Sequence, residues 1–286
     1  MSKYVPDIST RRWVLIASGR SKRPEHIHDH TCDFCVGQEN KTDAELFRIP
    51  PGNINGPGWQ VRVIKNKFPI TDLHEVIILT PHHDRDFEQL ATKEIEMIFT
   101  AFRHRYNEHR KQGQVLIFGN HKKLAGASID HPHAQLVVIP NQINLDALTK
   151  QPVMNIISEG KNFIAYCPEF SQWPYEIWIV PKKEQTYFGD IDDIQLNELA
   201  FCMQHSTKKL EHVFKHSQIT KVFKEDKDLF AYNYYIYPKQ DWYLRIIPRF
   251  VSRAGFELGT GLSVNIVDPV DAAQELVAAP PHEHGK

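Results

Sequence analysis

The sequence predicts an α+β fold made of two copies of one unit, with mostly antiparallel sheets flanked by helices. Two observations predict this fold. The order strand, strand ending in proline, helix, strand, strand ending in proline occurs twice along the 286 residues. The closing segments are also alike: 75–81 (EVIILTP) resembles 176–181 (EIWIVP), and 136–140 (LVVIP) resembles 244–248 (LRIIP). We therefore expect an N-terminal half over residues 1–150 and a C-terminal half over residues 151–286.

The first half carries five predicted strands and one predicted helix. Apolar and β-branched runs bounded by turn residues indicate the strands, which we place at 13–17, 60–65, 75–80, 114–119 and 136–139. A helix from about 87 to 110 is predicted by apolar residues at helical spacing, namely Ile95, Ile98, Phe102 and Tyr106.

The second half repeats this order. Its strands are expected at 163–166, 176–180, 229–236 and 242–247. Apolar residues at helical spacing predict a helix over 194–214, and they are Leu196, Leu199, Met203 and Leu210. A short helix over 267–278 should follow, because Asp268-Pro269 is a typical helix start.

The stretch before the strand at 136–139 concentrates polar groups that suit a catalytic site. Two histidines and a glutamine are spaced two residues apart, at His131, His133 and Gln135. Residues two apart in a strand point to the same face, so the three side chains should form one row while alternate residues enter the core. Gly126 and Ser128 bound a small-residue turn upstream. Imidazoles, an amide, a hydroxyl and exposed N–H groups together suit the handling of a phosphate group.

Cys32 and Cys35 form a C-x-x-C pair, which indicates a metal or a redox site. No thioredoxin-like βαβ pattern surrounds the pair, so we favour one structural Zn²⁺, which needs two further ligands. Eight histidines are candidates: His26, His28, His30, His74, His82, His83, His121 and His131. His131 is attractive because binding it would lock the strand that carries the neighbouring histidine. His83 is attractive because it follows a strand end and Pro81.

Composition and charge exclude several classes of protein. There are 34 Lys and Arg against 35 Asp and Glu, a net charge of −1, which predicts no nucleic-acid partner and no membrane-surface partner. No apolar run approaches the length of a membrane span. The N-terminus lacks the apolar centre and cleavage site of a signal peptide, so we expect a cytoplasmic protein.

Two further segments admit two interpretations each. Four cations lie close together near the N-terminus, at Arg12, Arg20, Lys22 and Arg23. They form either a solvated surface or a cradle for a diphosphate, which arginine binds well. The glycines of residues 255–261 form either a surface turn or a place where backbone approaches a ligand.

With these motifs the chain resembles the galactose-1-phosphate uridylyltransferase family, the transferase branch of the histidine-triad superfamily. The resemblance covers nearly the whole chain. Its blocks are 11–15, 20–24, Cys32 with Cys35, 62–69, 74–83, Asn120, 126–135 and 255–261. The His-Pro-His-Ala-Gln block at 131–135 is the most specific. The resemblance implies two histidine-triad-like halves, of which only the first keeps the histidine pair.

The resemblance also implies roles for individual residues. His133 would be the nucleophile, and Gln135 and Ser128 would bind the attacked phosphate. The zinc ligands would be Cys32, Cys35, His83 and His131. The substrate contacts would be Arg20, Arg23, Asn66, Asn120, Gly126 and Glu257.

The implied activity is transfer of a nucleoside monophosphate between a nucleoside-diphosphate hexose and a hexose 1-phosphate. UDP-glucose is the expected donor in this scheme, with a covalent nucleotidyl-His133 intermediate. Gln135 favours transfer over hydrolysis, because histidine-triad hydrolases carry a third histidine there and an amide cannot transfer a proton. An ADP-sugar phosphorylase or adenylyltransferase is the alternative, and residues 255–261 look like members with that activity.

Other interpretations remain open from the sequence. They are a nucleotide-sugar hydrolase, a nucleotide-binding sensor without catalysis, and a zinc-stabilised interaction module. Some family members hold a second metal on a Trp-His-x-His stretch, which here is Trp-Tyr-Leu-Arg at 242–245, so we expect no second metal. A homodimer is implied by the resemblance alone.

Overall fold

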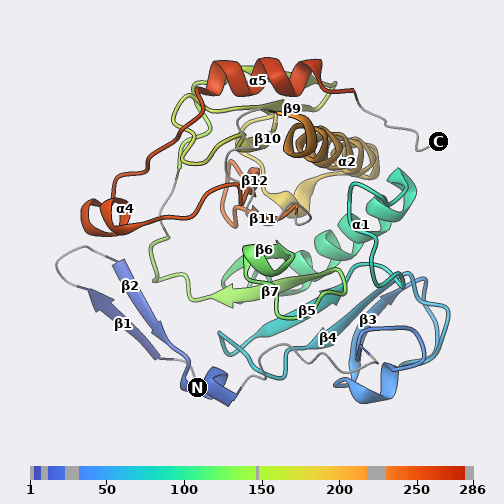
Figure 1. Cartoon of the computed structure of the whole chain (residues 1–286). Helices are drawn as coiled ribbons and strands as arrows, with labels where there is room; N and C mark the ends of the chain where they lie inside the picture. The colour runs from blue at the N-terminus through green and yellow to red at the C-terminus, as the bar shows by residue number, and fades with distance from the viewer. Residues whose placement is uncertain (1–2, 8–11, 23–31, 146–147, 218–229, 281–286) are drawn as a thin grey trace.

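The computed structural model describes residues 3–7, 12–22, 32–145, 148–217 and 230–280. A two-stranded hairpin and a ten-stranded sheet organise it (Figure 1). The strands are β1 (Lys3–Asp7), β2 (Arg12–Ile16), β3 (Glu45–Ile49), β4 (Val61–Lys65), β5 (His74–Ile78), β6 (Gln114–His121), β7 (His133–Ile139), β8 (Ile156–Glu159), β9 (Phe163–Tyr166), β10 (Ile177–Pro181), β11 (Tyr232–Ile236) and β12 (Leu244–Pro248). The helices are α1 (Thr92–His109), α2 (Asp193–His216), α4 (Gly255–Thr260) and α5 (Pro269–Ala278), with short 3-10 turns that include η1 (Ser18–Lys22) and η3 (Lys123–Ala125).

The ten-stranded sheet joins the two halves of the chain edge to edge. Its order is β3-β4-β5-β7-β6-β11-β12-β10-β9-β8, and every neighbouring pair is antiparallel. Outward from the β6–β11 seam, the first half runs β6, β7, β5, β4, β3 and the second runs β11, β12, β10, β9, β8. These are the corresponding strands of the repeated unit. The predicted α+β fold with antiparallel sheets is confirmed, whereas the division of the chain at residue 150 stays a prediction.

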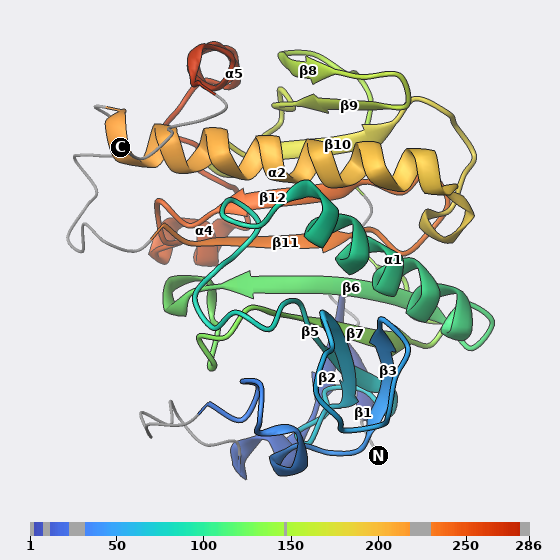
Figure 2. The same ribbon diagram turned by 90° about the vertical axis from the view of Figure 1, so that its right-hand side faces the viewer.

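Helices α1 and α2 lie on one face of this sheet, and Figure 2 shows both crossing in front of the strands. Their apolar sides are buried, as Phe102 of α1 and Met203 of α2 illustrate at 0% exposure each. They pack in one core with alternate residues of the strands, such as Leu136 of β7 and Leu244 of β12. The alternate side chains of β7, which include His133 and Gln135, point to the opposite face of the sheet, away from the helices. The polar side chains of β7 therefore gather on that face.

Several elements differ from the sequence prediction. Helix α1 begins at Thr92 rather than near residue 87, because 87–91 form turns before it. Strands β1, β3 and β8 were not predicted. Two of them, β3 and β8, are the edges of the large sheet, where the partly exposed pattern gives a weak periodic signal.

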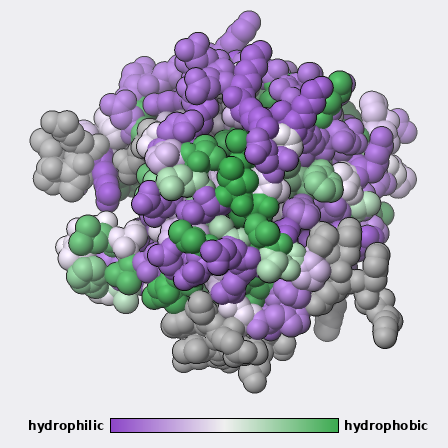
Figure 3. Space-filling view, turned by 90° about the horizontal axis from the view of Figure 1, so that it is seen from above, coloured by the Kyte–Doolittle hydropathy of each residue, from purple (hydrophilic) through white to green (hydrophobic). Residues whose placement is uncertain are grey.

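The side of the sheet away from α1 and α2 carries the β1–β2 hairpin and α4 (Figure 1). The glycine-rich segment contains a short helix. Residues 255–260 form α4, and Gly261 ends this helix with a φ of 75°. None of the residues of α4 is buried, and Phe256 and Leu258 are 56% and 78% exposed. Figure 3 shows a largely hydrophilic surface with a hydrophobic band across its middle and further hydrophobic residues at the lower left, on the side where Figure 1 places α4.

Candidate functional site

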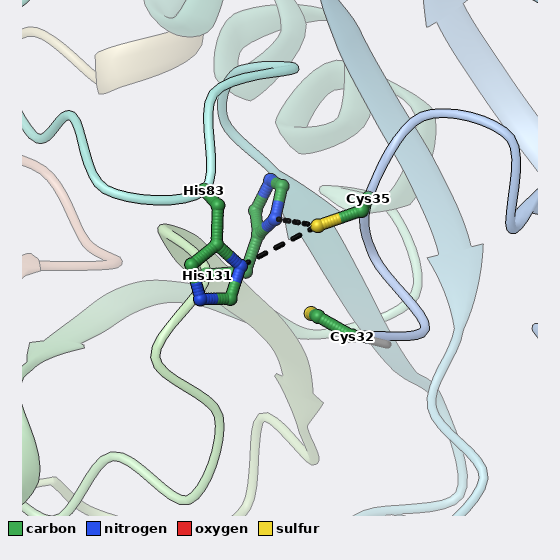
Figure 4. A group of neighbouring side chains, drawn as sticks. All are labelled: Cys32, Cys35, His83 and His131. Carbon is green, nitrogen blue, oxygen red and sulfur yellow. Dashed lines mark hydrogen bonds between the residues drawn. The ribbon is translucent and has the colours of Figure 1, made fainter. Parts of the chain in front are cut away.

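Two cysteines and two histidines form a cluster beside the first half of the sheet (Figure 4). Cys32 and Cys35 share one turn, in which the Cys35 N–H donates to the Cys32 carbonyl (3.0 Å). The Cys35 Sγ lies 3.4 Å from the Nδ1 of His83, which follows β5, and 3.6 Å from the Nδ1 of His131, which precedes β7. All four ligand atoms lie within 4.8 Å of one another. Two thiols and two imidazoles that converge in this way are a ligand set of tetrahedral Zn²⁺.

The surroundings of this cluster also suit a metal. The His131 Nε2–H donates to the Thr80 carbonyl (2.8 Å), which leaves the lone pair of Nδ1 facing the thiols. Burial lowers the pKa of His131 to about 4, so the ring is neutral at pH 7, as a ligand must be. Burial raises the pKa of the Cys32 thiol to about 11, and a bound cation would reverse that effect.

In the part of the chain that the structure describes, two of the eight candidate histidines lie close enough to the cysteines to share a metal ion with them. Within the described residues, His83 and His131 meet the cysteines. His82 turns away, and its Nε2 accepts from Arg85 Nη1 (3.0 Å). His26, His28 and His30 lie outside the described residues.

His133 is the first residue of β7 and is 8% exposed. Its Nδ1 lies 2.9 Å from the carbonyl oxygen of His131. A carbonyl can only accept, so Nδ1 carries the proton and Nε2 carries the lone pair. The row of three side chains that the sequence predicts is observed for His133 and Gln135, whereas His131 lies before the strand. The ring of His131 turns to the cysteines, and Pro132 has no N–H to donate to a neighbouring strand.

Gln135 and Asn66 converge on His74, one of the eight candidate metal ligands. The Gln135 Oε1 lies 3.0 Å from the Nε2 of His74, and Asn66 Nδ2 lies 3.1 Å from the same nitrogen. Arg20 joins this group, because its Nη1 donates to the carbonyl of Phe68 (3.0 Å) and Phe68 N–H donates to Asn66 Oδ1 (2.8 Å). Three predicted site residues thus meet where β4 ends and β5 begins.

Asn120 is held from the second half of the chain. The side-chain amide of Asn233 on β11 donates to Asn120 Oδ1 (2.8 Å) and to the Ala125 carbonyl (2.7 Å). Asn120 therefore turns its own NH₂ group away from Asn233. The same contacts fix the turn that ends at Gly126, whose φ of 87° favours glycine.

The register brings these amides beside the histidine. Gly119 pairs with Ala134, and Asn120 pairs with Asn233, so His133, Asn120 and Asn233 follow one line across β7, β6 and β11. Strands lie about 4.8 Å apart, which puts the backbone of Asn233 roughly 10 Å from that of His133. A pocket opens at this end of the sheet, and its lining includes Asn120, His121, Lys122, His133 and Tyr234.

The remaining predicted residues are less closely grouped. Ser128 is half-buried in the loop before β7. Arg23 lies outside the described residues. Glu257 lies on α4, where its Oε2 accepts from the Ala254 N–H (3.0 Å) at the start of the same helix.

A buried charged group next to the pocket had no signal in the sequence. His121 Nδ1 lies 2.9 Å from Asp86 Oδ2, and its Nε2 lies 3.6 Å from Glu88 Oε1. Tyr232 donates to Glu88 Oε2 (3.1 Å). Burial raises the pKa of Glu88 to about 7. These residues come from a loop and two strands, so only the folded chain brings them together.

Known proteins show the same combination of sequence blocks and fold. Residues 72–139 match the family model for the N-terminal domain of galactose-1-phosphate uridyl transferase. The chain is 26% identical to the ADP-glucose phosphorylase of Arabidopsis thaliana over 94% of this chain and 91% of that protein. It is 23% identical to the galactose-1-phosphate uridylyltransferase of Thermotoga maritima over 93% of this chain and 95% of that protein.

In sequence and in fold, the chain is similar to the galactose-1-phosphate uridylyltransferase family. A crystal structure of the Arabidopsis thaliana ADP-glucose phosphorylase with bound ADP-glucose matches it with a TM-score of 0.71 and 25% identity, over 97% of this chain and 99% of that one. The prediction of an enzyme of the nucleotidyltransferase class is confirmed by these relatives. No helix among the described residues combines the length and the apolar character needed to cross a membrane.

The second half of the chain has different residues at the positions that correspond to the histidine site. Asp241 corresponds to His133, and its Oδ1 accepts from Lys150 Nζ (3.0 Å). Tyr243 corresponds to Gln135 and stacks on Trp178, with ring centroids 4.1 Å apart. These side chains have structural contacts where the first half has His133 and Gln135.

Proposed function

We propose that this enzyme transfers a nucleoside monophosphate from a nucleoside-diphosphate hexose to a phosphate-bearing acceptor through a covalent nucleotidyl-His133 intermediate. The observation that carries the proposal is the Nδ1–H of His133, which donates to the His131 carbonyl. That hydrogen bond selects the tautomer in which Nε2 is the nucleophile. The carbonyl also stabilises the positive charge that the ring acquires on attack.

Two displacements complete the reaction. In the first, His133 Nε2 forms a bond to the α-phosphorus, and the bond from phosphorus to the bridging oxygen breaks, releasing hexose 1-phosphate. In the second, a phosphate oxygen of the acceptor attacks the same phosphorus and the P–N bond breaks, which returns His133 to its neutral form. Both leaving groups depart with their electron pairs and need no proton from Gln135, which an amide could not supply.

Neutral donors around the nucleophile would stabilise the phosphoryl oxygens. We assign this role to Gln135 and Ser128, with Asn66, Asn120 and the Gly126 turn binding the nucleotide. Arg20 is linked to Asn66 through the backbone of Phe68, whose carbonyl accepts from Arg20 and whose N–H donates to Asn66, and Arg20 would contact the diphosphate. Arg23 and Glu257 keep their proposed substrate roles from the family resemblance.

Zn²⁺ is proposed as a structural ion held by Cys32, Cys35, His83 and His131. With all four positions filled by protein, the ion would supply rigidity and no bound water. Because His131 also presents the carbonyl that orients His133, a fixed His131 would fix the nucleophile.

Two donor and acceptor pairs are candidates. One is UDP-glucose with a hexose 1-phosphate. The other is ADP-glucose with inorganic phosphate. We favour it because the chain is 26% identical to the ADP-glucose phosphorylase of Arabidopsis thaliana and 23% identical to the uridylyltransferase of Thermotoga maritima. Cytoplasmic location and a homodimer stay predictions from the sequence.

Intact-protein mass spectrometry tests the proposal directly. The protein is incubated briefly with UDP-glucose, and separately with ADP-glucose, in buffer without phosphate or acceptor. A mass gain of one UMP or one AMP, absent in His133→Ala, would support the mechanism and identify the base. Gln135→Ala should form the same adduct about 10²–10³-fold more slowly, the cost of losing one donor. Retained turnover by His133→Ala would contradict the scheme.

A further inference from the structure

His74 lies at the start of β5, next to β7, and it is 2% exposed. In the β5–β7 ladder Val76 pairs with Gln135, so the His74 ring reaches Gln135 diagonally from the neighbouring strand. Its Nδ1 accepts a hydrogen bond from the backbone N–H of Ile70 (2.9 Å). That backbone N–H can only donate, which excludes a proton on Nδ1.

The tautomer of His74 follows from this contact. A neutral imidazole with an accepting Nδ1 has its single N–H at Nε2. That N–H can donate to the Gln135 Oε1, which lies 3.0 Å from Nε2. Gln135 therefore gives its oxygen to His74 and keeps its NH₂ group for the side of the nucleophile.

Asn66 is oriented by the same logic. Its Oδ1 accepts from the Phe68 N–H (2.8 Å), so its NH₂ group is the part that lies 3.1 Å from His74 Nε2. A protonated Nε2 offers this NH₂ no lone pair. Asn66 therefore does not compete with Gln135 for the proton on His74 Nε2.

We propose that His74 is a positioning residue for nucleotidyl transfer, which orients the Gln135 amide so that its NH₂ group faces the transferred phosphoryl group. The inference deepens the proposed function and rests on it. Without the His74 N–H, the amide of Gln135 can rotate by half a turn and present its oxygen to the phosphoryl oxygens, which would repel them. A donor that is already oriented toward the phosphoryl oxygens stabilises the charge that develops on them in the transition state. A Gln135 amide that is free to rotate would lose this effect.

Two substitutions of His74 separate its two hydrogen bonds. His74→Asn places an amide oxygen near the position of Nδ1 and keeps the acceptor for Ile70, but it loses the donor to Gln135. His74→Gln reaches the position of Nε2 with an NH₂ group and keeps that donor, but it loses the acceptor for Ile70. Thr71→Val is a matched control, because Thr71 bonds the Leu73 carbonyl in the same turn and belongs to no proposed site.

The test is a double-mutant cycle on the rate of adduct formation under single-turnover conditions, with whichever of UDP-glucose and ADP-glucose labels the wild type. His74→Asn should slow the saturated rate about 10–100-fold, up to the worth of one donor, with a smaller change in the substrate concentration for half-saturation. His74→Gln should retain more of the rate. In the Gln135→Ala background, His74→Asn should have almost no further effect, whereas Thr71→Val should act alike in both backgrounds.

The outcomes distinguish this inference from the proposed function. Equal effects of His74→Asn with and without Gln135 would overturn the positioning role while the adduct itself stands. A rate for His74→Asn equal to wild type, with an unchanged melting temperature, would overturn it as well. If wild type forms no adduct with either sugar nucleotide, the proposed function fails first and the inference fails with it.

Discussion

Gly119 lies at the seam between the two halves, and its replacement by alanine should be costly. The residue belongs to β6 and pairs with Ala134 of β7 and with Tyr234 of β11. A Cβ added at Gly119 would overlap the ring of Tyr234. Tyr234 is 3% exposed, and the ring of Phe87 packs edge-on against its ring with the ring centroids 5.4 Å apart. The ring of Tyr234 therefore cannot move away without displacing a second aromatic residue.

Two opposing effects set the change in the free energy of unfolding that Gly119→Ala should cause. Overpacking a well-filled core costs about 1–3 kcal/mol and occasionally more. Replacing glycine by alanine also removes freedom from the unfolded chain, which stabilises by about 0.4–1 kcal/mol. With an overlap this severe, we expect Gly119→Ala to lower the free energy of unfolding by about 2 kcal/mol. For a chain of this size that corresponds to a melting temperature about 3 °C lower.

Gly259→Ala provides the matched control. Gly259 lies within α4, and a Cβ there would meet nothing within 4 Å. Alanine is favoured over glycine in a helix by about 0.5–1 kcal/mol, so this variant should be at least as stable as wild type. Urea titration and thermal melting of both variants make the comparison. A Gly119→Ala protein as stable as Gly259→Ala would refute the packing argument.

Three further predictions concern the metal and the buried charges. His83→Ala should abolish stoichiometric zinc in metal analysis and lower the melting temperature, whereas His82→Ala, whose ring contacts an arginine instead, should retain zinc and change stability by less than about 0.5 kcal/mol. Burial raises the pKa of Glu88 in the folded protein to about 7. The contribution of Glu88 to the free energy of unfolding is therefore present at low pH, where the carboxyl is protonated, and is lost as the pH rises from about 4.5 through about 7. Glu88→Gln should therefore gain on wild type by on the order of 2–3 kcal/mol across that window, and parallel pH profiles of unfolding would contradict this. Glu75→Ala leaves the buried Arg105, which Glu75 binds at 2.9 and 2.6 Å, without its carboxylate and should cost about 3–5 kcal/mol in urea unfolding, while a cost under 1 kcal/mol would exclude a stabilising role for the pair.

Local periodicity was sufficient for most of the elements. The strand at Phe163–Tyr166 was predicted with its observed bounds, and the helix expected at 194–214 is observed at Asp193–His216. These segments carry their pattern within themselves, because the side chains alternate between core and solvent with the period of the element. The common face of His133 and Gln135 was predicted for the same reason.

Edges and partly exposed segments carried too little pattern for prediction. Strands β3 and β8 are the two outer strands of the sheet, and each has a neighbour on one side only. The segment 255–260 is helical, whereas its glycines allowed either a surface turn or a close approach of backbone to a ligand. Its conformation depends on the rest of the fold more than on the propensity of its residues.

The sequence by itself determined the α+β class, the duplication and the residue types of the site, because these are recorded in short-range spacing. Only the tertiary structure decided which histidines meet the cysteines, since His83 and His131 lie 48 and 96 residues from Cys35 along the chain. It also decided the join of the halves at β6 and β11, the support of Asn120 by Asn233, and the orientation of Gln135 by His74. Each of these contacts is made across strands, and strand order and register bring together side chains that no local pattern connects.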